Sequence, residues 1–158
     1  MTHERWQGQI RKCLSVAEHQ PERALKSLDM LLDRLQSDLK RHSGDWHIDQ
    51  TLEVVSIVQS HHQAHRQSAE TILRLAERYE QQASYYRRAF VAACATAALE
   101  LASAGDRSGA MRALRRARPV GAGVRPPERL LQKAEKVVAA IPRRKSSSRE
   151  SRVRQSSR

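Results

Sequence analysis

Apolar side chains recur along the chain at steps of three and four residues, the spacing that gathers them on one face of an α-helix. No stretch alternates Val, Ile or Thr with polar residues over the length of a strand, so the pattern predicts an all-α fold, an antiparallel bundle of helices. Between residues 21 and 41 the row consists of Leu25, Leu28, Leu32, Leu35 and Leu39. Such a row is typical of a coiled-coil seam, through which two copies of the chain would be able to associate.

Turn-forming residues divide this pattern into six predicted helices. Pro21 suits the first turn of a helix, Gly105 suits the end of one, and Pro119 is expected to stop the fifth. Asp49 is expected to cap the third, whose middle is polar, so the pattern leaves open whether residues 49–83 form one helix or two. The predicted helices span about 3–19, 21–41, 49–82, 84–104, 107–118 and 127–140.

Beyond Pro142 the chain is rich in Arg and Ser and has almost no apolar residues. We therefore expect one helical domain over residues 1–142 and a disordered basic tail over residues 143–158. Cys13 and Cys94 lie far apart within apolar helical patterns, which is typical of core residues in a reducing compartment. No signal peptide and no apolar run long enough for a membrane span is visible, so we expect a cytoplasmic protein that does not contact a membrane.

The net charge of +12 is segregated along the chain. Residues 1–106 hold 13 basic and 14 acidic residues, whereas residues 107–158 hold 16 basic and 3 acidic ones. The guanidinium group of Arg is a planar fork that binds phosphate and carboxylate through two hydrogen bonds, so residues 107–158, the C-terminal third of the chain, are expected to bind nucleic acid or an acidic protein surface. The predicted contact residues are Arg107, Arg112, Arg115, Arg116, Arg118, Arg125, Arg129, Arg143, Arg144, Lys145, Arg149, Arg152 and Arg154.

Two observations limit this expectation. No acidic residue lies between Arg107 and Arg118, so the helix face repels itself unless an anion is bound. The tail has no aromatic residue for base stacking and no motif of sequence-specific recognition, so any contact with nucleic acid is expected to be independent of sequence. Whether the partner is DNA, RNA or protein stays open, as does the alternative that the tail only solubilises the chain.

Residues 91–119 resemble a tetratricopeptide repeat, a pair of antiparallel helices. Ala98 and Leu101 match its small and large apolar positions, Gly105-Asp106 its turn, and Ala110, Leu114 and Ala117 the packing face of its second helix. The resemblance implies a scaffold that binds a protein or peptide in a groove, without catalysis, and the last helix would then close the stack. A small chaperone or regulator that holds a partner helix is the alternative function.

The remaining candidates are weaker. His61 and His65 lie one turn apart, but no further ligand completes a metal site, so we predict no metal and no cofactor. Tyr and Arg are common at interfaces, which makes a second contact patch of Tyr85, Tyr86, Arg87 and Arg88. Neither cysteine has a base near it in sequence, so nothing indicates an enzyme.

Overall fold

The computed structural model describes residues 1–39, 46–81, 86–121 and 127–142. These residues contain seven helices and no strand, which confirms the all-α prediction. The helices are α1 (His3–Ala17), α2 (Pro21–Leu39), α3 (Trp46–His61), α4 (His65–Gln81), α5 (Arg87–Ser103), α6 (Arg107–Gly121) and α7 (Pro127–Ala140).

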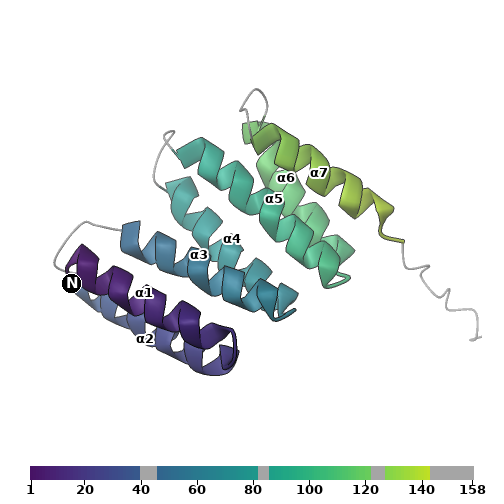
Figure 1. Cartoon of the computed structure of the whole chain (residues 1–158). Helices are drawn as coiled ribbons and strands as arrows, with labels where there is room; N and C mark the ends of the chain where they lie inside the picture. The colour runs from purple at the N-terminus through teal and green to yellow at the C-terminus, as the bar shows by residue number, and fades with distance from the viewer. Residues whose placement is uncertain (40–45, 82–85, 122–126, 143–158) are drawn as a thin grey trace, which may run out of the picture.

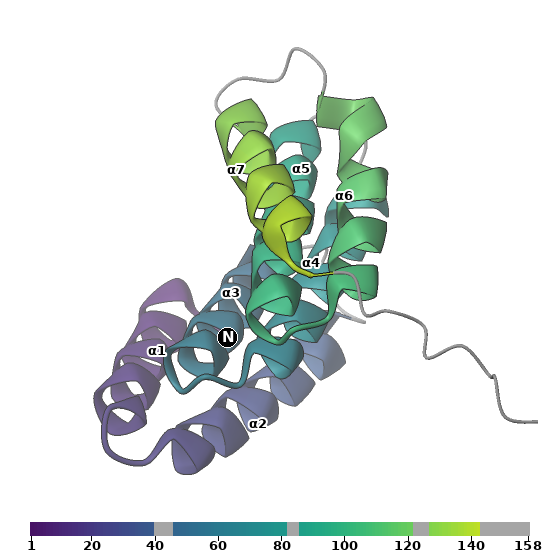
Figure 2. The same ribbon diagram turned by 90° about the vertical axis from the view of Figure 1, so that its right-hand side faces the viewer.

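Successive helices pair as hairpins, α1 with α2, α3 with α4 and α5 with α6, and α7 packs on both α5 and α6. The hairpins stack in chain order, so that α1 lies at one end of the molecule and α7 at the other (Figure 1). The odd-numbered helices form one layer and the even-numbered helices the other, as the perpendicular view shows (Figure 2). Each hairpin therefore packs mainly on its neighbours in the stack.

The predicted third segment is two helices. α3 ends at His61, and Gln63 adopts φ 60°, in the left-handed region. The backbone N–H of Ala64 donates to Gln59 O (2.8 Å) and that of Gln63 donates to Ser60 O (3.0 Å), the bond pattern that closes a helix around a left-handed residue. The chain therefore reverses here and returns as α4.

Two predicted helix boundaries are wrong. α3 begins at Trp46, so Asp49 is not a cap but a residue within the helix, where its buried carboxylate accepts a hydrogen bond from Arg78. α6 continues through Pro119 to Gly121. Pro119 cannot donate the usual hydrogen bond, and its ring crowds the carbonyl four residues earlier, but in the last turn this disturbs only the end of the helix and does not force it to stop at residue 118.

The leucine row of α2 belongs to the core of the chain itself. Leu28, Leu32 and Leu35 are buried, and α2 packs on both α1 and α3. Leu25 is half-buried and packs against the same core, whereas the side chain of Leu39 lies outside the described part. The three buried leucines are covered by the chain's own helices, so this fold offers no support for association of two copies through them.

α5 is the central helix of the C-terminal half and packs on α4, α6 and α7. Its alanines, among them Ala93, Ala97 and Ala98, are buried together with Cys94. Small side chains allow three helices to approach one helix closely. Among the described helices, none combines the length and the apolar character needed to cross a lipid bilayer.

Candidate acidic-partner interface

α6 begins with a turn that fixes the orientation of its arginines. Gly105 adopts φ 73°, and the N–H of Asp106 donates back to Leu101 O (2.8 Å), which closes α5. Asp106 then caps α6, because its Oδ1 accepts a hydrogen bond from the N–H of Gly109 (2.8 Å). A Cβ at Gly109 would lie 2.6 Å from Asp106 Oδ2, so a larger residue there would force the capping carboxylate to shift.

From this cap onward α6 has one apolar and one cationic face. Its buried residues are Ala110, Ala113, Leu114 and Ala117. Arg112, Arg115 and Arg118 are exposed, and Arg107 is half-buried at the first turn. The sequence spacing thus identified correctly which side of this helix is charged.

Neighbouring helices neutralise two of these arginines, which the local sequence does not predict. Arg116 Nη2 donates to Glu80 Oε2 of α4 (2.8 Å), and its guanidinium lies 5.7 Å from the centroid of the Phe90 ring. Arg118 Nε donates to Glu135 Oε1 of α7 (2.8 Å). The expectation of a helix face without any acid partner is therefore wrong for these two residues.

The other arginines of α6 and α7 have no carboxylate partner among the described residues. Within residues 86–121 and 127–142, Arg107, Arg112, Arg115 and Arg129 form no ion pair with any described carboxylate. Arg129 is exposed on α7, the helix that packs on α6. We call the exposed Arg112 and Arg115 of α6 the cationic surface.

A groove of about 490 Å³ between α4 and α6 adjoins this surface. Arg66 of α4 and Arg112 of α6 stand on its two walls, and Leu73 and Leu101 contribute apolar lining. Asp106, which already holds the cap of α6, and Glu70 are its acidic members. Of the cations that line the groove, Arg66 and Arg112 have no described carboxylate partner, whereas Arg116 is paired with Glu80. Together with the apolar lining, the two unpaired cations suit an acidic segment that also carries apolar side chains.

Several predicted contact residues lie outside the described residues, and the structure says nothing of them. These are Tyr85, Arg125, Arg143, Arg144, Lys145, Arg149, Arg152 and Arg154.

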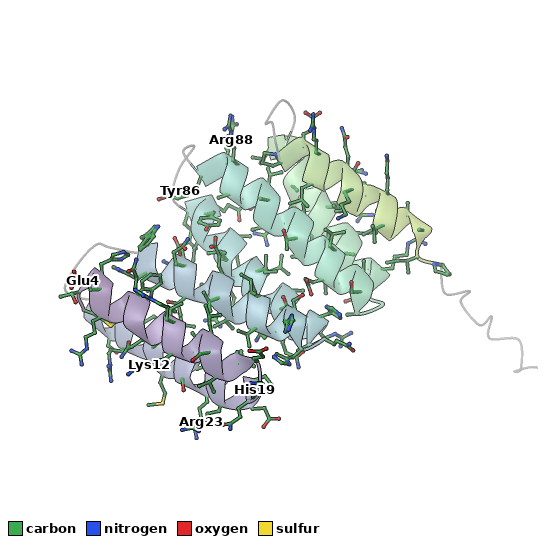
Figure 3. All side chains as sticks on the ribbon, viewed as in Figure 1. Glu4, Lys12, His19, Arg23, Tyr86 and Arg88 are labelled. Atoms are coloured by element: carbon green, nitrogen blue, oxygen red, sulfur yellow. The ribbon has the colours of Figure 1, made fainter. Side chains whose placement is uncertain are left out.

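The predicted Tyr–Arg patch is only partly exposed. The rings of Tyr86 and Tyr79 stack, with centroids 5.5 Å apart and planes 8° apart, so Tyr86 packs against the protein's own core. Arg87 and Arg88 are exposed at the start of α5 (Figure 3, where Tyr86 and Arg88 are labelled). Tyr86 therefore acts mainly in packing, and the two arginines remain available for contact.

The histidines of the α3–α4 turn make hydrogen bonds that tie helices together. His62 Nε2 donates to Ala17 O at the end of α1 (2.9 Å), and His65 Nδ1 donates to Glu100 Oε2 of α5 (2.8 Å). Ser60 donates to the other oxygen of Glu100 (2.8 Å). No group of three metal-ligating side chains occurs in the part of the chain that the structure describes.

A buried polar cluster joins α3 to α4, and sequence reasoning missed it. Arg78 Nε donates to Asp49 Oδ1 (2.5 Å), while Glu53 accepts hydrogen bonds from Tyr79 and Gln50. Burial is the main cause that raises the pKa of Glu53, and burial followed by the nearby carboxylate of Glu53 raises the pKa of Tyr79. The only sequence signal was polar residues within an otherwise apolar helix face.

Both thiols are poorly suited to nucleophilic chemistry. Cys94 is fully buried in α5, and burial raises its pKa to about 11. Burial also raises the pKa of Cys13. Since the thiolate is the reactive form, both cysteines stay protonated near neutral pH.

Comparison of the chain with protein-family models, with curated proteins and with solved structures found no match.

Proposed function

We propose that the chain is a non-enzymatic adaptor whose helical stack carries a basic C-terminal third that binds nucleic acid or an acidic protein surface without reading sequence. The observation that carries the proposal is the cationic surface, because Arg112 and Arg115 are exposed and, like Arg129 of α7, lack a described carboxylate partner. Like charges placed on neighbouring turns disfavour an isolated helix, and a bound anion removes that penalty.

The helical framework supports this function physically. α6 is anchored on α5 and α7 through its alanines and Leu114, so its arginines project from a packed helix. A partner's carboxylates or phosphates then meet arginines whose helix backbone is already ordered, so that binding has to order only their side chains, which lowers its entropic cost. Exposed pairs such as Arg118–Glu135 are weak, so a partner is also able to compete for their arginines.

The tetratricopeptide-like character of α5 and α6 belongs to the same proposal. Ala98, Leu101 and the left-handed Gly105 have the burial and the turn that such a hairpin requires. A stack of hairpins is a scaffold for binding, and the proposal therefore includes no catalysis and no cofactor. A cytoplasmic location is part of it, because two buried, protonated thiols suit a reducing compartment.

The test replaces Arg112 and Arg115 with Gln and measures binding of a duplex oligonucleotide and of a polyglutamate peptide over a series of salt concentrations. On the duplex, loss of two phosphate contacts should lower the slope of log affinity against log salt by about 1.8. The matched control replaces Arg5 and Arg11, which are exposed on α1. Equal slopes for the variant and the native chain with both probes would reject the proposal.

An apolar groove favours the alternative function of a chaperone or regulator. About 240 Å³ of space lies between α3 and α5 over α4, lined by Ile72, Leu75 and Ala92. Ile57 lies at the same groove and is 61% exposed. If this groove holds a partner helix, binding should survive high salt and be lost in Ile57→Glu, whereas binding through the cationic surface should show the opposite behaviour.

A further inference from the structure

The α1–α2 hairpin carries a groove at the end of the stack opposite α7. The groove measures about 320 Å³ and is lined only by residues of α1 and α2. Its apolar lining includes the buried Cys13, Ala24 and Leu31, while Met30 stands at it with 62% of its surface exposed. At the other end of the stack α7 covers α5 and α6, so the two ends of the molecule differ.

The charged residues of this groove are all cations. Lys12 of α1 and Arg23 and Arg34 of α2 line it, and no carboxylate is among its described lining residues. Lys12 and Arg34 make no ion pair with described residues, and Arg23 donates only to the neutral Gln20 (3.2 Å). Figure 3 labels Lys12 and Arg23 on this hairpin.

The cations are distributed along the groove rather than gathered at one point. Arg23 and Arg34 lie eleven residues apart on one helix, a separation of about 16 Å at 1.5 Å per residue. A small amphiphile has one charged head group and would neutralise one end only. An extended partner with several carboxylates along its length would neutralise all three cations.

We infer that the α1–α2 groove binds an acidic amphipathic helix of a partner protein. Apolar residues of that helix would pack on Leu31 and Met30, and its Asp or Glu side chains would pair with Lys12, Arg23 and Arg34. This site is separate from the cationic surface of α6, and it would give the adaptor a second partner at the opposite end of its stack. Its occupancy does not depend on the proposed function of α6.

The test is selection from a displayed library of three-turn and longer helical peptides against the full chain. Each peptide keeps one face of Leu, and the flanking positions vary among Glu, Lys, Ser and Ala. The inference expects enrichment of Glu-flanked peptides, and the best of them, synthesised and labelled, should bind the Lys12→Glu/Arg34→Glu variant at least about tenfold more weakly than the native chain.

Matched variants separate this site from others. Arg11→Glu changes an exposed charge of α1 that does not line the groove and should leave peptide affinity unchanged. Arg112→Gln/Arg115→Gln should also bind the peptide normally, even if those changes abolish binding to anions elsewhere. Ser27→Trp fills the groove from a position exposed to solvent and should block binding while the circular dichroism spectrum stays native.

Three results would overturn the inference. The first is that the library selection enriches neutral or Lys-flanked peptides, and the second is that it enriches no peptide at all. The third is that Lys12→Glu/Arg34→Glu or Ser27→Trp keeps native helicity and still binds the acidic peptide as tightly as the native chain.

Discussion

The Asp49–Arg78 pair offers the sharpest test of how the middle of the stack is held together. Asp49 is 4% exposed, and the side chain of Arg78 is 25% exposed, so removal of the carboxylate takes an ion-pair partner away from a cation with limited access to water. Breaking a buried pair from one side costs about 3–5 kcal/mol. We take the lower end for Asp49→Ala, about 3 kcal/mol, because Arg78 keeps some contact with water.

For a chain of this size each kcal/mol lowers the melting temperature by about 2–4 °C, so Asp49→Ala should melt about 6–12 °C lower than the native chain. The assay is thermal and urea unfolding followed by circular dichroism, with Asp33→Ala at an exposed position of α2 as the control. The double replacement Asp49→Leu/Arg78→Met should recover much of the loss, since it removes both charges of the pair from the site. If Asp49→Ala and Asp33→Ala melt within about 1 °C of each other, the pair does not hold α3 to α4 as argued.

Three further predictions follow from the structure. Gly105→Ala places a side chain at φ 73° and should lower the free energy of unfolding by about 1–2 kcal/mol. Gly8→Ala, which adds a methyl group in open space on α1, should raise that free energy slightly. Urea titration measures both changes. Glu53→Gln should stabilise the chain near neutral pH, because burial raises the pKa of Glu53 above its ordinary value of 4.5 and the ionised carboxylate therefore opposes folding. As the pH rises through that raised pKa, the free energy of unfolding should fall for the native chain but not for the variant. Both thiols should resist maleimide at pH 7.5 in the native state and react fully in denaturant, as mass spectrometry would report; rapid labelling of native Cys94 would contradict its burial.

Local signals in the sequence were enough for much of the fold. Pro21, Gly105 and Pro127 mark boundaries that depend on backbone geometry within one turn, and the structure has helices that begin or end there. The break at Gln63 was harder to locate, because a glutamine in the left-handed conformation gives no signal comparable to that of glycine. Its hydrogen bonds close α3, but the sequence shows only a polar stretch.

Contacts between distant residues could not be predicted. The charged side of α6 follows from its own periodicity, yet Glu80 and Glu135 reach Arg116 and Arg118 from helices 36 and 17 residues away in the chain. The grooves likewise form between helices, so Lys12 and Arg34 appear in sequence as ordinary surface residues. Segregation of charge along the chain indicated an anionic partner, and only the fold separates arginines that are already paired from those that are not.

The arginine Nε–Hε signals of the ¹⁵N-labelled chain, recorded by NMR during titration with polyglutamate at low salt, test the central claim most directly. The account predicts progressive shifts for Arg112 and Arg115, which lack a described carboxylate partner, and unchanged signals for Arg5 and Arg11 on α1. If the signals of Arg112 and Arg115 remain unchanged while those of arginines elsewhere shift, the cationic surface of α6 is not the anion-binding site that we propose.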